Sequence, residues 1–113
     1  MTAYVLAQID VKDIEDYREY MKHTPRIISQ YGGRFLVRGG EMETLEGPGE
    51  TLRMILIEFP SMEQAKTFYH SEEYTLAREL RGGAGIARII AIDGFTSGQW
   101  EEAVSESSQY TLP

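Results

Sequence analysis

The spacing of apolar residues predicts a strand, a helix and a second strand in the first half of the chain. Residues 3–11 alternate in the way that a strand does, and both of its sides are largely apolar. Asp13 is a suitable N-cap for the helix that follows. Pro25 is expected to kink this helix, because proline lacks a backbone donor and crowds the carbonyl four residues earlier. Gly32-Gly33 then ends the helix, and residues 34–38 form the second strand.

The second half repeats this pattern after an acidic loop over residues 39–51. Residues 52–59 form the third strand, and Ser61 with Gln64 has the spacing of a capping box at the start of the second helix. Ser71 restarts that helix, and Gly82-Gly83 ends it before a fourth strand over residues 86–93. The restarted part is expected to turn three side chains inward, namely Tyr74, Ala77 and Leu80.

The order strand, helix, strand, strand, helix, strand is the ferredoxin-like βαββαβ pattern. We therefore predict an α+β fold with a four-stranded antiparallel sheet and two helices on one of its faces. One domain is expected over residues 1–95. Residues 96–113 contain no lysine or arginine and show little periodicity, so they are predicted to be a C-terminal extension. Trp100 and Tyr110 are its candidate anchors, on this chain or on a partner subunit.

Parity along the four strands sorts their residues into two faces. The first face is apolar and is expected to lie under the helices; it holds Val5, Ala7, Ile9, Phe35, Val37, Ile55, Ile57, Phe59, Ala87, Ile89 and Ala91. The second is too apolar to be left in water; it holds Tyr4, Leu6, Gln8, Arg34, Leu36, Arg38, Met54, Leu56, Glu58, Arg88, Ile90 and Ile92. Because both helices cover the first face, we expect the second face to pair with the same face of another copy, which gives a two-fold dimer.

Two arginines stand at the ends of the second strand. If the second and third strands pair so that Arg38 lies opposite Met54, Arg34 lies beside Glu58, and these two residues are candidates for a structural ion pair. Arg38 has no acid assigned to it on this face. It is therefore the first candidate for binding the carboxylate or enolate of a ligand.

The second helix carries further candidate site residues. Tyr74, Arg78 and Arg81 are candidates for framing the mouth of a ligand pocket together with Tyr20 of the first helix; the alternative for Arg78 is a surface ion pair. His70 is a weak candidate for a catalytic proton carrier, and the alternative is an ordinary exposed histidine at a helix junction.

Composition narrows the classes of function. The formal net charge of −7, from 18 acidic and 11 basic residues, argues against a nucleic-acid surface. There is no cysteine, so disulfides and thiol catalysis are excluded. No run approaches ~18 apolar residues, and the start lacks the features of a secretory signal, so we expect no membrane span and a cytoplasmic location. Histidines 23 and 70 show no ligand spacing, so neither a metal nor another cofactor is expected.

Three segments carry a resemblance to a known family. They are the run from Tyr31 to Gly40, the run from Arg53 to Ser61 with Ala65, and the run from Tyr69 to Tyr74 followed by Arg78 and Arg81. Together they resemble the bacterial family named domain of unknown function 1330, over about residues 3–95. That family is similar to the dimeric α+β barrels, ferredoxin-like protomers that pair sheet to sheet. The resemblance implies no particular activity, since related families include cofactor-free monooxygenases, isomerases and haem-dependent enzymes.

Two interpretations of function remain open at this point. In the first, a homodimer binds a small anionic or aromatic organic molecule in a cleft and catalyses a proton-transfer or oxygenation step without a cofactor. In the second, the dimer is a non-catalytic structural or ligand-binding module whose polar residues set its geometry.

Overall fold

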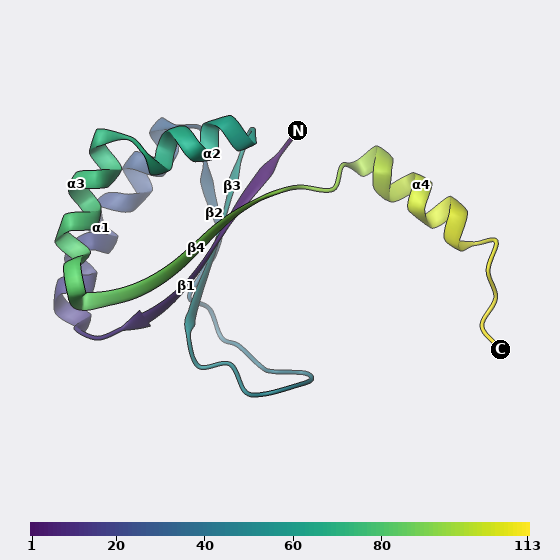
Figure 1. The fold of residues 1–113 in the computed structure, drawn as a ribbon, viewed down its shortest axis with the longest axis horizontal. Helices are drawn as coiled ribbons and strands as arrows, with labels where there is room; N and C mark the ends of the chain where they lie inside the picture. Colours follow the sequence, from purple (N-terminus) through teal and green to yellow (C-terminus); the bar gives the residue numbers. More distant parts are fainter.

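A computed structural model describes all 113 residues of the chain (Figure 1). Its elements are β1 (Ala3–Val11), α1 (Ile14–Gln30), β2 (Arg34–Arg38), β3 (Arg53–Phe59), α2 (Met62–Tyr69), α3 (Glu72–Arg81), a 3₁₀ turn (Gly82–Ala84), β4 (Gly85–Asp93) and α4 (Ser97–Ser107). None of the helices is both long and apolar enough to cross a membrane.

The four strands form one antiparallel sheet in the order β2-β3-β1-β4. Helices α1, α2 and α3 lie on one side of it, and the other side carries no helix of the domain (Figure 1). This is the predicted α+β, ferredoxin-like arrangement, which is confirmed. The open side exposes apolar residues on both edge strands, among them Leu36, Val37, Ile90 and Ile92.

Local chemistry accounts for where the first helix begins and ends. The Asp13 carboxylate accepts the backbone N–H groups of Glu15 and Asp16 at 3.1 and 3.2 Å, as an N-cap does. At the other end the N–H of Gly32 bonds to the Ser29 carbonyl and that of Gly33 to the Ile28 carbonyl, which is a Schellman motif. Gly32 has a φ of +81°, so glycine suits the position that reverses the chain.

The start of α2 corrects one detail of the sequence analysis. Ser61 accepts the N–H of Gln64 at 3.1 Å, as predicted, but the Gln64 side chain does not complete the box. Its amide instead donates to the Tyr31 carbonyl at 3.0 Å. Gln64 therefore ties the start of α2 to the end of α1, because that carbonyl has no partner within its own helix.

The core is a layer of aromatic rings between the helices and the sheet. Phe68 of α2 lies 5.1 Å from Phe59 of β3 and 4.6 Å from Tyr74 of α3, centroid to centroid. Tyr17 and Tyr20 of α1 continue the layer, with their centroids 5.6 Å apart. Such offset and tilted pairs add to the apolar burial that holds helices on a sheet.

A β-bulge in β2 changes the predicted faces. Arg34 pairs with Glu58 and Phe35 with Ile57, but the register then shifts, so that Val37 pairs with Leu56 and Arg38 with Ile55. Two residues, Leu36 and Val37, stand opposite one, and both are exposed on the open side. The predicted faces of Val37 and Arg38 were therefore wrong, because parity sorting assumes an uninterrupted strand.

The C-terminal extension forms a helix that the sequence analysis did not predict. Thr96 and Gln99 make a complete capping box at the start of α4, a signal that was present in the sequence. No residue of α4 is buried, and the helix projects far from the sheet (Figure 1). The radius of gyration of 17.1 Å is consequently larger than the roughly 13 Å expected of a compact domain of about 100 residues.

Candidate functional site

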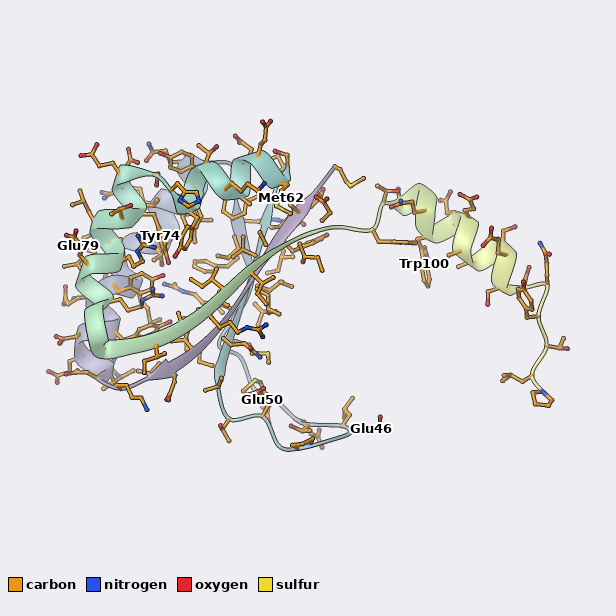
Figure 2. All side chains as sticks on the ribbon, in the orientation of Figure 1. Glu46, Glu50, Met62, Tyr74, Glu79 and Trp100 are labelled. Atoms are coloured by element: carbon orange, nitrogen blue, oxygen red, sulfur yellow. The ribbon has the colours of Figure 1, made fainter.

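A small cavity lies between the sheet and the helices, at the centre of the aromatic layer. Its volume is about 30 Å³, close to the space that one water molecule needs. Its lining residues with polar side-chain atoms are Tyr17, Tyr20, Tyr69, Tyr74, Thr24 and Arg38. Figure 2 shows Tyr74 directed from α3 toward the sheet.

Two tyrosines of the cavity form a buried hydroxyl pair. The oxygens of Tyr20 and Tyr74 lie 2.7 Å apart, although their positions are 54 residues apart in the sequence. Burial raises the pKa of Tyr20 far above its usual range, and the Tyr74 hydroxyl raises it further. Tyr20 is therefore a neutral hydrogen-bonding group at any physiological pH.

A larger groove adjoins this cavity at the β4 edge of the sheet. Its volume is about 180 Å³, and it is lined by the sheet residues Val5, Ile89 and Ala91 and by Ala65, Lys66, Phe68, Tyr69 and His70 of the α2 region. Four of these residues also line the inner cavity, namely Val5, Phe68, Tyr69 and Ile89. The two hollows are therefore neighbours that share walls. We call the larger one the edge groove.

The polar groups of the edge groove are few and lie on its helical side. Lys66 and His70 are both exposed residues, so their cationic or titratable ends can reach water as well as a ligand. The His70 ring meets the Tyr69 ring edge-on, with centroids 5.2 Å apart. An apolar hollow with a small number of polar groups is the usual form of a site for a small organic molecule.

Arg78 touches this site indirectly. Its Nη1 donates to the Tyr69 hydroxyl at 2.5 Å, and its Cζ lies 5.0 Å from the centroid of the same ring. Arg78 does not line either hollow. It holds Tyr69, which forms a wall of both.

Arg38 lies where the sequence analysis did not expect it. The bulge turns it to the helix side, where its Cζ stacks 4.6 Å from the Phe35 centroid and Nη2 donates to the Met21 carbonyl at 2.7 Å. That carbonyl lies four residues before Pro25, which has no N–H to offer it. The predicted face of Arg38 was therefore wrong. No acid pairs with Arg38, as expected, and its partner is a helix carbonyl that lacks the usual N–H donor because residue 25 is proline.

Arg34 and Glu58 lie together on the open face of the sheet. Nε of Arg34 is 3.3 Å from Oε1 of Glu58, in the pairing that was expected. The Arg34 side chain keeps 71% of its exposure, so in a single copy this is a surface contact of little energetic weight.

Arg81 is buried, whereas the sequence analysis expected Leu80 to be the inward residue of this turn. Arg81 retains 8% of its exposure, whereas Leu80 retains 48%. The buried residues of α3 are Tyr74, Ala77 and Arg81. In the last turn the buried position is therefore Arg81 and not its predicted neighbour Leu80. Arg81 lies over the Tyr20 ring, 5.2 Å from its centroid, and does not line the cavity.

Of the predicted pocket residues, the structure thus brings Tyr74, Tyr20 and Arg38 to one cavity and His70 to the adjoining groove. Sequence reasoning missed Lys66, which no pattern singled out, and Arg53. Arg53 shares the parity of Ile55, Ile57 and Phe59, so an arginine on the core face could have been noticed. No group of three or more histidine, aspartate or glutamate side chains lies close enough together to hold a metal ion.

Residues 2–95 match the family described as "Domain of unknown function (DUF1330)". The chain belongs to this family. The resemblance carried by the three sequence segments is therefore confirmed, and the DUF1330 region covers the sheet and the three helices on it but not α4. A comparison with curated proteins finds no match.

Solved structures share the DUF1330 fold. A protein of unknown function from Rhodopseudomonas palustris has a TM-score of 0.67 at 18% identity, over 84% of this chain and 83% of that one. A provisionally assigned antibiotic biosynthesis monooxygenase from Caulobacter crescentus has a TM-score of 0.55 at 19% identity, over 84% and 91%. A dimeric, ferredoxin-like protein of unknown function from Bacteroides fragilis has a TM-score of 0.50 at 14% identity, over 82% and 96%. At these identities the likenesses show the fold alone.

Proposed function

We propose that this DUF1330 protein binds a small organic acid with an apolar or aromatic body in the edge groove, and that it does so as a homodimer. The observation that carries the proposal is the composition of the groove, in which apolar walls meet Lys66 and His70 at one side. The apolar walls fit a hydrocarbon or aromatic body, and the Lys66 ammonium complements a carboxylate. With a volume of about 180 Å³, the groove suits a single small ring or a short chain.

The inner cavity extends the same site in this proposal. Its hydroxyl pair, Tyr20 and Tyr74, offers a hydrogen bond to a group that reaches past Tyr69, and Arg38 bounds the cavity at its β2 side. Arg78 acts through Tyr69 as a positioning residue. The cavity has a volume of about 30 Å³, so it admits at most one small substituent of a ligand.

A proton-transfer step would fall to His70 in this arrangement. It is the histidine that lines the groove, and an imidazole beside a bound acid can accept or donate a proton. Without a proton-transfer step the protein is a ligand-binding module. The groove geometry is compatible with an enzyme and with a binding module.

Ligand binding is tested by thermal shift and calorimetry with named probes. Benzoate, 4-hydroxybenzoate and hexanoate are expected to raise the melting temperature in a saturable manner, and benzyl alcohol is expected to do so more weakly because it lacks the charge. Ala91→Phe, which fills the groove from its exposed edge, and Lys66→Gln should each weaken benzoate binding. Lys22→Gln is the matched control, since Lys22 is an exposed helical lysine outside the groove. Equal benzoate binding by Ala91→Phe and wild type would show that the groove is not the site.

A second copy is proposed to cover the open face of the sheet. Exposed apolar side chains of both edge strands lie there, and the Bacteroides fragilis neighbour of this fold is dimeric. In a dimer of this kind the Arg34–Glu58 pair would be buried at the interface and would gain weight as a structural contact. Light scattering at micromolar concentration is expected to give twice the chain mass of 12.8 kDa.

The same dimer gives α4 a place to pack. Trp100 and Val104 of α4 retain 63% and 48% of their exposure, so in a single copy α4 presents large apolar side chains to water. We place this helix on the partner subunit, so deletion of residues 96–113 should weaken the dimer. Ile90→Glu on the open face should give monomers, whereas Leu76→Glu on the exposed surface of α3 should not. Wild-type protein that scatters as a monomer would refute the proposed assembly.

A further inference from the structure

Two arginines from distant parts of the sequence lie against neighbouring tyrosine rings of the first helix. Arg53 begins β3, and its Cζ lies 5.8 Å from the Tyr17 centroid. Arg81 ends α3, and its Cζ lies 5.2 Å from the Tyr20 centroid. The Tyr17 and Tyr20 rings are themselves in contact, and both arginines act electrostatically on Tyr17. We call Tyr17, Arg53 and Arg81 the buried cationic cluster.

The cluster holds hydrogen-bonding atoms that have no partner. Nε and Nη1 of Arg81, Nε of Arg53 and the hydroxyl of Tyr17 are all buried and unbonded. Arg81 is more than nine-tenths buried, and Tyr17 is completely so. Buried polar atoms are nearly always satisfied in folded proteins, so four bare atoms in one cluster require an explanation.

No acid of the chain neutralises these charges. The ion pairs of the protein join Lys12 to Asp10, Lys22 to Glu19 and Arg34 to Glu58, and none of them involves the cluster. A guanidinium group stays protonated, so it cannot lower its cost by losing the charge. This is unexpected in a chain with 18 acidic and 11 basic residues, where acids are plentiful.

Tyr17 does not supply the missing negative charge either. Burial raises the pKa of Tyr17, although Arg53 and Arg81 oppose this effect. The phenol is therefore neutral and contributes a hydrogen-bond donor.

The backbone near Arg53 is shaped to hold it. Gly39 has a φ of +65°, and the Arg53 guanidinium occupies the space where any side chain at position 39 would begin. Arg53 Nη2 reaches the Arg38 carbonyl at 3.4 Å, a long contact, and Nε is buried without a partner. Because Arg53 is only partly buried, the cluster opens to water at the base of the acidic loop.

We propose that the buried cationic cluster is a binding site for a small planar oxyanion, a carboxylate such as formate or an ion of the same shape. Two guanidinium groups present several N–H donors and the phenol oxygen is the one acceptor beside them, so donors are in excess, and a planar oxyanion matches the fork of a guanidinium group. The cluster shares no lining residue with the edge groove, and it meets the inner cavity only at Tyr17.

The test uses formate and nitrate as probes, with ionic strength held constant by sodium gluconate, which is too bulky for a buried site. Formate is expected to raise the melting temperature of the wild type in a saturable manner. Arg53→Gln, at the open side of the cluster, should raise the half-saturating formate concentration at least tenfold, and Arg81→Gln should abolish the response. Arg26→Gln is the matched control, because Arg26 is an exposed arginine outside the cluster.

A second measurement does not depend on the folding of the variants. In wild-type protein with nitrogen-15 labelled arginine, formate should shift the Nε–Hε resonances of two arginines together. The formate concentration at half-saturation should equal the one measured from the melting temperature. The absence of a saturable shift, or a full formate response in Arg81→Gln, would overturn the proposal. Ala91→Phe separates the two sites. Loss of benzoate binding in this variant, with an unchanged formate response, supports both sites. If benzoate does not bind the wild type but formate does, the groove is refuted and the cluster is supported.

Discussion

Removal of the Arg38 guanidinium is expected to destabilise the protein through a helix carbonyl rather than through any ligand. Nη2 of Arg38 donates to the Met21 carbonyl at 2.7 Å, and Pro25 is the reason that this carbonyl lacks its usual helical donor. Arg38→Met keeps an apolar stem against Phe35 but deletes the charge-assisted hydrogen bond and the cation–π contact.

The size of the effect follows from the exposure of the contact. A hydrogen bond to a charged group contributes about 1.5–3 kcal/mol when it is protected. Arg38 is an exposed residue and water can replace it in part, so we expect about 1 kcal/mol. The cation–π contact with Phe35 adds about 0.5–1 kcal/mol at an exposed site. Arg38→Met should therefore cost about 1.5–2 kcal/mol.

A double-mutant cycle with Pro25→Ala isolates the hydrogen bond. Alanine at position 25 restores an N–H that can bond to the Met21 carbonyl, so Arg38→Met in this background should lose only the cation–π part. The coupling free energy is then about 1 kcal/mol, measured by urea unfolding followed by far-UV circular dichroism. Arg34→Met, which removes an exposed arginine from the same strand, should show no coupling to Pro25→Ala. An equal cost of Arg38→Met in both backgrounds would refute the role of the freed carbonyl.

Three further predictions concern other parts of the fold. Gly33→Ala should cost about 1–3 kcal/mol in urea unfolding, because the new methyl would stand 2.6 Å from the Phe59 ring, whereas Gly40→Ala, with nothing within 4 Å, should be close to neutral. Glu58→Ala should change stability by less than about 1 kcal/mol in a monomeric variant such as Ile90→Glu, because the pair with Arg34 is then exposed. Stability should fall above about pH 10, where tyrosines of the unfolded chain ionise while burial holds the pKa of Tyr20 higher in the folded state. Equilibrium unfolding from pH 8 to 11 should show a shallower decline for Tyr20→Phe than for the wild type.

The parts of this protein that follow from neighbouring residues were predictable. Asp13, Ser61 and Ser71 cap their helices as the sequence suggested, because a cap needs only a side-chain oxygen and N–H groups two or three residues away. The ferredoxin-like order of strands and helices followed from the same kind of local pattern. The capping box of α4 is equally local, but the tail lacks the hydrophobic periodicity on which the prediction of the other helices rested.

The candidate site was only partly predictable, and the errors have one physical origin. A strand face is set by pairing with its neighbour, so a single bulge after Phe35 moved Arg38 to the other side of the sheet. Which residue of the last turn of α3 is buried depends on the rings available beneath it, and Tyr20 accommodates Arg81. Neither fact has a counterpart in the local sequence.

The block from Tyr31 to Gly40 shows where the division lies. Its glycines end a helix and make room for Phe59 and Arg53, and the helix-ending role is readable from sequence because backbone conformation is a local property. The partners of Arg34 and Arg38 cannot be read from the sequence, because each depends on the strand register and on a carboxylate or carbonyl from elsewhere in the chain. Residue order thus specified the elements and the family, whereas long-range packing alone decided which cations meet an acid, a carbonyl or nothing.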